Sequence, residues 1–97
     1  DFSSPEFLFY LESVIQDRRL NPVEGSYTNH LFSRGLNRIA QKTGEEAVEL
    51  VIASKDNNKE LFLGEAADLM YHYLVLLAQK DCTLSDVVDV LKDRHSR

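Results

Sequence analysis

The sequence contains a single cysteine, Cys82. One thiol can form neither an intrachain disulfide nor a cluster of thiolates that binds zinc, and this usage is typical of a reducing compartment. No segment has the pattern of a signal peptide, and we find no apolar run that approaches a membrane span. We therefore expect a cytoplasmic protein without a membrane partner.

Basic residues are also scarce, with 11 Lys and Arg against 16 Asp and Glu and a formal net charge of −5. This balance disfavours nonspecific binding to a nucleic acid backbone, although an acidic protein can still bind phosphates locally. The 97 residues, 43% of them hydrophobic and 28% charged, predict one globular domain over residues 1–97. A chain this short buries only roughly 60–65% of its unfolded surface, so oligomerisation would add stability.

No segment alternates between apolar and polar residues as a strand does, and there is no internal repeat or low-complexity stretch. The spacing of apolar residues instead predicts helices. Their approximate ranges are residues 4–19, 28–54, 59–79 and a last helix that begins behind Thr83. The second of these is expected to be interrupted near Gly35 or Gly44.

Helix starts are marked by capping residues. Ser3 or Ser4 precedes Pro5, whose missing N–H costs nothing in a first turn. Thr28 can cap the second helix, and Thr83 with Asp86 forms a variant of the capping box before the fourth.

The third predicted helix has apolar residues almost all around its axis, so it should be buried on every side. These residues are Leu61, Phe62, Leu63, Leu69, Met70, Tyr71, Tyr73, Leu74, Val75, Leu76 and Leu77. A domain of this size has too few helices to cover such a helix alone. We expect an all-α bundle of four to five helices, completed by a homodimer in which this helix contributes to the interface.

Four charged residues of the second helix share one face, within an arc of about 100° at 100° per residue. They are Lys42, Glu45, Glu46 and Glu49. On the third helix Glu65, Asp68 and His72 fall within about 60° of one another, beside leucines. Like charges at such spacings cost roughly 0.2–0.5 kcal/mol per pair, so a cation is expected to neutralise them.

Antiparallel packing of these two helices would bring two pairs of acids face to face. The small side chains Ala47, Ala66 and Ala67 leave room for this. Carboxylates without histidine pairs or thiolates suit magnesium or manganese, which would accept the remaining ligands from substrate phosphates. Such a site activates water for attack on phosphorus, with Glu45 or Glu46 as the base that takes its proton.

Taken singly, each acidic pair is more often a solvated face; two clusters on consecutive helices favour a metal site. His72 is either a partner of the site one turn after Asp68 or a core histidine with satisfied hydrogen bonds.

The segments Lys42-Thr43-Gly44-Glu45-Glu46-Ala47-Val48-Glu49 and Glu65-Ala66-Ala67-Asp68 resemble the E-E-x-x-E and E-x-x-D motifs of the all-helical, MazG-like nucleotide pyrophosphohydrolases. Within that superfamily the chain is similar to the phosphoribosyl-ATP pyrophosphohydrolases, from about Phe7 to His95. The similarity extends to Asn21-Pro22, Glu24-Gly25-Ser26-Tyr27-Thr28, Leu31-Phe32 and Asp68-Leu69-Met70-Tyr71-His72.

This resemblance implies that Glu46, Glu49, Glu65 and Asp68 hold magnesium, with Glu45 beside them. It implies hydrolysis of phosphoribosyl-ATP to phosphoribosyl-AMP and pyrophosphate in histidine biosynthesis. The family is often fused behind a phosphoribosyl-AMP cyclohydrolase domain, and a chain that begins at Asp1 is compatible with such a fusion. The zinc-handling cysteines of that partner domain are absent here, so this chain alone should lack its activity.

Substrate phosphates need cations, and Lys42 is the best placed, about one turn before the acids on the same face. Further candidates are Arg18, Arg34, Arg38 and Lys55, although each is more often a solvated surface charge. Ser26 and Thr28 can cap the second helix or bind phosphate at its amino end, and capping is the stronger expectation. Tyr27 is either a core aromatic or a ring that stacks on a base.

Two other functions remain open. A housecleaning hydrolase of free nucleoside triphosphates would use the same metal chemistry with another base pocket. A noncatalytic helical dimer that binds partners would carry its acids as a solvated face.

Overall fold

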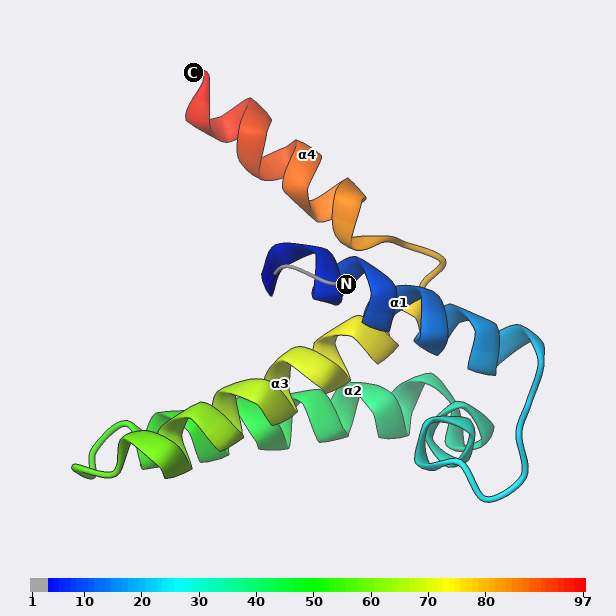
Figure 1. Cartoon of the computed structure of the whole chain (residues 1–97), viewed down its shortest axis with the longest axis horizontal. Helices are drawn as coiled ribbons and strands as arrows, with labels where there is room; N and C mark the ends of the chain where they lie inside the picture. Colours follow the sequence, from blue (N-terminus) through cyan, green and yellow to red (C-terminus); the bar gives the residue numbers. More distant parts are fainter. Residues whose placement is uncertain (1–3) are drawn as a thin grey trace.

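The computed structural model describes residues 4–97, which form four helices and, within that range, no strand (Figure 1). The helices are α1 (Ser4–Leu20), α2 (Tyr27–Ala53), α3 (Lys59–Gln79) and α4 (Leu84–His95). Their ends lie within about a residue of those expected, and the all-α prediction is confirmed. The capping role predicted for Ser3 falls outside the described residues.

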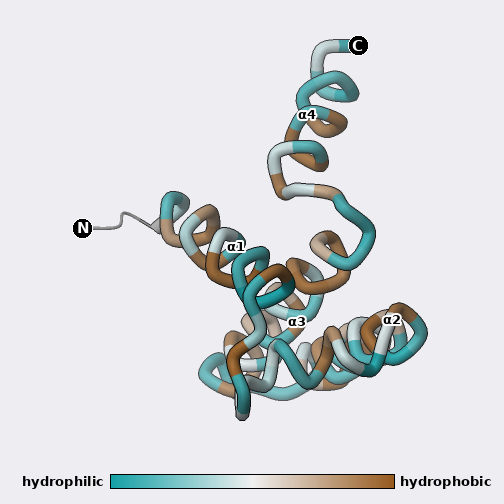
Figure 2. Tube along the Cα trace, turned by 90° about the vertical axis from the view of Figure 1, so that its right-hand side faces the viewer, coloured by the Kyte–Doolittle hydropathy of each residue, from teal (hydrophilic) through white to brown (hydrophobic). Residues whose placement is uncertain are grey.

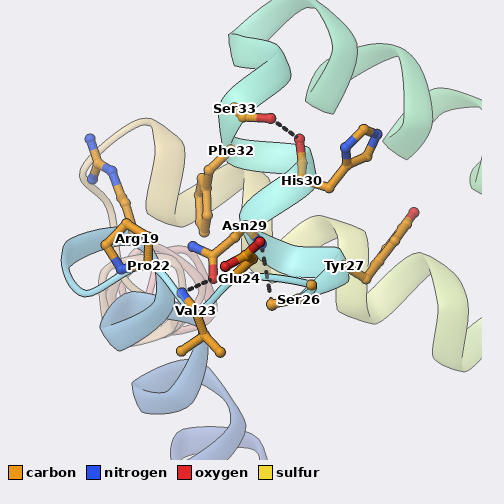
Figure 3. Close-up of a pocket in the computed structure, with 11 residues that line it drawn as sticks. Arg19, Pro22, Val23, Glu24, Ser26, Tyr27, Asn29, His30, Phe32 and Ser33 are labelled. Atoms are coloured by element: carbon orange, nitrogen blue, oxygen red, sulfur yellow. Dashed lines mark hydrogen bonds between the residues drawn. The ribbon is translucent and has the colours of Figure 1, made fainter.

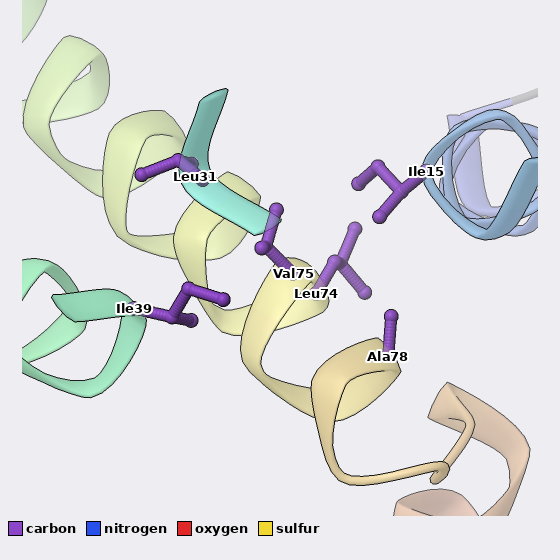
Figure 4. Packing of buried hydrophobic residues seen from close by; sticks show 6 residues of the cluster. All are labelled: Ile15, Leu31, Ile39, Leu74, Val75 and Ala78. Atoms are coloured by element: carbon purple, nitrogen blue, oxygen red, sulfur yellow. The ribbon is translucent and has the colours of Figure 1, made fainter. Parts of the chain in front are cut away.

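The helices α2 and α3 form an antiparallel hairpin that makes the most extensive contacts of the fold, and α1 packs against both (Figure 1). Figure 4 shows where the three helices meet, with Ile15 of α1 facing Leu74 of α3 and with Ile39 of α2 on the other side of Val75. These four side chains are the largest that are fully buried. Removing such groups from water supplies most of the stabilisation of a small domain.

The first turn of α2 is capped by Ser26, whose hydroxyl accepts a hydrogen bond from the Asn29 N–H. The prediction of Thr28 as the cap is therefore wrong. Thr28 lies inside the helix, is buried, and its hydroxyl is hydrogen-bonded to that of Tyr71 on α3. A hydroxyl in this position satisfies a buried polar partner instead of an orphan N–H.

Gly35 interrupts α2 with φ +83° and ψ −179°, a conformation that is essentially restricted to glycine. The predicted interruption is thus at Gly35, while Gly44 is helical. In Figure 1 the part of α2 before the break is seen nearly end-on, and the longer part after it lies along α3. The break turns the first residues of α2 back towards the middle of α3.

The carboxyl end of α3 is tied to α1. The Cys82 N–H donates to the Leu77 carbonyl at 2.9 Å, with Asp81 at φ +57°, and this pattern is a Schellman motif. Arg19 of α1 donates to the Ala78 carbonyl and to the Asp81 carboxylate, each at 2.5 Å. One guanidinium therefore fixes α1 against the end of the central helix.

The last helix, α4, stands apart from the other three in two views (Figures 1 and 2). Its start has the predicted capping box between Thr83 and Asp86, and the Leu84 N–H donates to Glu12 of α1 at 2.5 Å. Beyond this point α4 makes sparse contacts and contains no buried residue.

The prediction that α3 is buried on every side is wrong for a single chain. Leu63 is 54% exposed, and Leu61 and Met70 are also exposed. On α2, Ile52 is 62% exposed, and Val48 and Val51 are similarly exposed. We refer to these six residues as the exposed apolar residues of the hairpin.

The expectation that no apolar run approaches a membrane span also needs correction. By length and composition alone, α3 is long and apolar enough to cross a membrane. The central helix of a compact fold meets the same criteria, and α3 packs against α1 and α2. It also carries Glu65 and Asp68 in mid-helix, where a membrane span would make charges expensive.

Candidate metal centre

Three carboxylates from the two helices of the hairpin come together. Glu46 and Glu49 of α2 and Glu65 of α3 each place one oxygen so that the three oxygens lie within 4.8 Å of one another. Glu46 is only 6% exposed, Glu65 is half-buried, and Glu49 is exposed. The predicted facing of the two acidic segments is thus observed for three of the four residues expected to hold metal.

Two carboxylate oxygens of this group are buried without a hydrogen-bond partner: Glu46 Oε2 and Glu65 Oε2. A buried acceptor without a partner forfeits its interactions with water, and the loss is larger for a charged group. A divalent cation is the partner that such oxygens fit, because Mg²⁺ and Mn²⁺ prefer carboxylate ligands. The donor set is therefore compatible with the predicted metal.

Lys42 supplies the positive charge at this group in the structure. Its Nζ lies 3.3 Å from Glu46 Oε1 and 3.7 Å from Glu45 Oε1. The hydrogen bond to Glu46 raises the pKa of Lys42, helped by the nearby charges of Glu46, Tyr27 and Glu45, while partial burial opposes the rise. Lys42 is therefore a permanent cation at neutral pH, but one charge does not balance three carboxylates.

The other two predicted acids lie at the margin of the group. Glu45 is exposed, and its Oε2 accepts a hydrogen bond from Gln41 at 3.0 Å. Asp68 is exposed, one turn after Glu65, and lines an open depression together with Glu65 and Gly64. Neither carboxylate belongs to the group of three.

The remaining predicted cations are not at the acids. Arg18 lies 3.6 Å from Asp17 on its own helix. Arg34 and Lys55 are exposed and Arg38 is half-buried. Within residues 4–97 none of these four forms an ion pair with a carboxylate of the site, so their binding of substrate stays a prediction.

His72 is a core histidine with both ring nitrogens satisfied. Nδ1 lies 2.8 Å from the backbone carbonyl oxygen of Asp68, and Nε2 lies 2.8 Å from the hydroxyl of Tyr27. Tyr27 is 50% exposed, so the expectation of a core aromatic is wrong. The sequence offered no signal for this contact, because it joins residues 45 positions apart.

An open cavity of about 1020 Å³ lies at the loop before α2 (Figure 3). Its polar groups are largely engaged: Ser26 caps α2, and Asn29 bonds to the Val23 N–H and to the Arg18 carbonyl. Tyr27 borders this cavity (Figure 3), but its hydroxyl is hydrogen-bonded to His72 of α3. The group of three carboxylates, with its two unpartnered buried oxygens, is therefore a better candidate than this cavity for binding a cation.

An all-helical fold with carboxylates gathered between two antiparallel helices defines a class of protein with a candidate site for a divalent cation. A family model described as phosphoribosyl-ATP pyrophosphohydrolase matches residues 8–95. The chain belongs to the phosphoribosyl-ATP pyrophosphohydrolase family, as the resemblance of its motifs predicted.

Curated relatives of two kinds are similar to the chain. A phosphoribosyl-ATP pyrophosphatase of Clostridium acetobutylicum is 49% identical over 92 residues, covering 95% of this chain and 84% of the relative. One of Listeria innocua is 52% identical over 87 residues, covering 90% and 84%. The histidine biosynthesis bifunctional protein HisIE of Bacillus subtilis is 51% identical over 86 residues, which cover 89% of this chain but only 41% of that protein.

Proposed function

We propose that the chain hydrolyses phosphoribosyl-ATP to phosphoribosyl-AMP and pyrophosphate in the cytoplasm, with Mg²⁺ as its cofactor and Mn²⁺ as a substitute. The observation that carries the proposal is the group of three carboxylates with two buried, unpartnered oxygens. Family membership supports the substrate and the reaction, because relatives about 50% identical bear the name of this activity.

Glu46, Glu49 and Glu65 would hold the cation, and Asp68 would join them from the next turn of α3. A divalent cation bound there supplies neutralisation of phosphate charge and a water of lowered pKa. The buried position of Glu46 keeps bulk water from competing for its oxygens.

Glu45 is the better placed of the two predicted bases. Glu46 forms an ion pair with Lys42 and also belongs to the group of three carboxylates. Glu45 lies outside that group, next to it in sequence, and its carboxylate is exposed. It can therefore take a proton from an attacking water while the other acids keep their roles.

Lys42 would bind the substrate phosphates. It is already protonated and fixed at the edge of the carboxylates by Glu45 and Glu46. An incoming phosphate would share this ammonium, which attracts charge without the bidentate geometry of an arginine.

A second copy of the chain would cover the exposed apolar residues of the hairpin, which no part of residues 4–97 covers. Exposed apolar side chains in number are typical of protein interfaces, and a twofold pair would bring the two hairpins together. The homodimer therefore accompanies the proposed activity.

The whole protein would be either a free-standing pyrophosphohydrolase or a longer protein in which this domain is fused to a phosphoribosyl-AMP cyclohydrolase. Bifunctional relatives match this chain over less than half of their own length. The chain itself has one thiol and would not catalyse the cyclohydrolase step.

The test is release of pyrophosphate with Mg²⁺ from phosphoribosyl-ATP, ATP and the deoxynucleoside triphosphates at equal concentrations. Release from phosphoribosyl-ATP alone is expected. Release mainly from free triphosphates would assign the chain to housecleaning hydrolysis instead, and no release from any of them would favour a binding module.

A further inference from the structure

Two tyrosine hydroxyls connect the first turn of α2 with the middle of α3. Tyr27 is hydrogen-bonded to His72, and the neighbouring Thr28 is hydrogen-bonded to Tyr71. Both contacts depend on the break at Gly35, which turns this part of α2 towards α3. Only the first of them continues to a residue of the acidic site.

The two hydrogen bonds of His72 have a defined direction. Nδ1 faces the carbonyl oxygen of Asp68, which can only accept, so Nδ1 carries the hydrogen. In the neutral ring Nε2 is then an acceptor, and the Tyr27 hydroxyl donates to it. His72 is 6% exposed, so water offers little alternative to either partner.

The part of α2 after the break contacts the same histidine. The Thr43 hydroxyl, whose closer acceptor is the Ile39 carbonyl at 2.9 Å, also lies 3.3 Å from the His72 carbonyl, and Thr43 directly follows Lys42. Thr43 therefore links the part of α2 that carries Lys42 to the same histidine that Tyr27 contacts.

We propose that Tyr27 and His72 are positioning residues of the candidate pyrophosphohydrolase site: the chain Tyr27–His72–Asp68 fixes the turn of α3 from which Asp68 completes the cation site. The inference rests on the proposed function, since it gives that site its fourth carboxylate. Asp68 stands outside the group of three, so the position of its turn decides whether its carboxylate can reach a cation there. Partners that orient metal ligands commonly change metal affinity by roughly 10–100-fold when removed.

Tyr27→Phe and Tyr71→Phe make a matched pair for the test. Each removes one tyrosine hydroxyl that links α2 to α3, at contacts one residue apart. Tyr27→Phe is expected to raise the Mg²⁺ concentration for half-maximal activity about tenfold and to lower kcat more than it raises KM. Tyr71→Phe is expected to lower the melting temperature and leave the Mg²⁺ dependence unchanged.

The substitutions His72→Asn and His72→Gln each remove a different contact of the hydrogen-bonded series Tyr27–His72–Asp68. An asparagine amide can replace the Nδ1 donor to Asp68, whereas a glutamine amide reaches the position of Nε2 and can replace only the contact with Tyr27. Each variant therefore keeps one contact and loses the other, and each is expected to raise the Mg²⁺ concentration for half-maximal activity about as much as Tyr27→Phe does. An unchanged Mg²⁺ dependence in either variant would overturn the inference.

The rise of the melting temperature with Mg²⁺ gives a readout that needs no activity. Its half-maximal Mg²⁺ concentration should increase about tenfold in Tyr27→Phe and stay constant in Tyr71→Phe. Equal behaviour of the two variants, or no stabilisation of the unmodified chain by Mg²⁺, would overturn the inference. Stabilisation by Mg²⁺ without release of pyrophosphate would instead leave the inference standing and overturn the proposed function.

Discussion

Glu46 belongs both to the ion pair with Lys42 and to the group of three carboxylates. One of its oxygens lies 3.3 Å from Lys42, and the other is buried with no partner. The same carboxylate places one oxygen within 4.8 Å of an oxygen of Glu49 and of an oxygen of Glu65.

Loss of one carboxylate of the group should abolish the proposed turnover without unfolding the chain. Glu49→Gln keeps the size of an exposed side chain and removes a charged ligand, so we expect a loss of activity of about 100-fold or more with unchanged helix content. Asp68→Asn should behave in the same way. Pyrophosphate release and circular dichroism would measure both effects, with the exposed Glu6→Gln on α1 as the control; full activity in either variant would refute the assigned role.

Lys42 gives a prediction for alkaline pH. Its pKa is raised above 10.5 by Glu46, so the ion pair stabilises the fold below that pH and its contribution is lost as pH rises through the higher value. The melting temperature of the unmodified chain should exceed that of Lys42→Met by a constant margin from pH 7 to about pH 9. The margin should shrink from about pH 10.5 upward, and a margin that persists at pH 12 would show that the lysine acts through packing.

At the scale of elements, the break in α2 decides which residues meet. The extended backbone at Gly35 separates the turn that carries Tyr27 from the helix that carries the acids, and it lets both contact α3. An uninterrupted helix would place Tyr27 more than 20 Å along the axis from Lys42, at about 1.5 Å per residue. The contacts of Tyr27 thus depend on one backbone conformation.

Gly35→Ala should therefore destabilise the fold by about 1–3 kcal/mol, because a side chain is strained in that conformation. Apart from the adjoining backbone and the two neighbouring residues, no atom lies within 4 Å of the added methyl group, so the effect would come from the backbone conformation. Gly44→Ala is the control: this residue is helical and equally open, and the change should stabilise the fold by about 0.5–1 kcal/mol. Urea unfolding of both variants measures the difference, and equal midpoints would contradict the role of Gly35.

The helices and the facing of the two acidic segments were predictable from sequence because both follow from a repeat of 3.6 residues. The particular ligands Glu46, Glu49, Glu65 and Asp68 were implied only by the resemblance to the family, and the structure brings the first three together. The link from Tyr27 to His72 was not predictable, because it depends on the direction that the chain takes after Gly35. Both Ser26 and Thr28 were predicted as caps because either hydroxyl can accept a hydrogen bond. The prediction is confirmed for Ser26 and wrong for Thr28, whose hydroxyl is hydrogen-bonded to Tyr71.

For the whole molecule, the exposed apolar residues of the hairpin predict a dimer. Sedimentation at micromolar concentration should show a dimer for the unmodified chain, and Ile52→Glu should shift it to the monomer. Val23→Glu adds the same charge at an exposed apolar residue of the loop before α2 and should leave the dimer intact. A monomeric unmodified chain would contradict the prediction.

The carboxylates of the site, Lys42 and the two positioning residues all lie between Tyr27 and His72, on α2 and α3. The helix α4 adds no side chain to this set, and α1 serves it only by packing. Added polypeptide at either end of the domain would therefore leave the chemistry untouched. Such independence suits a catalytic unit that is used in two formats, alone in some relatives and as part of a longer bifunctional chain in others.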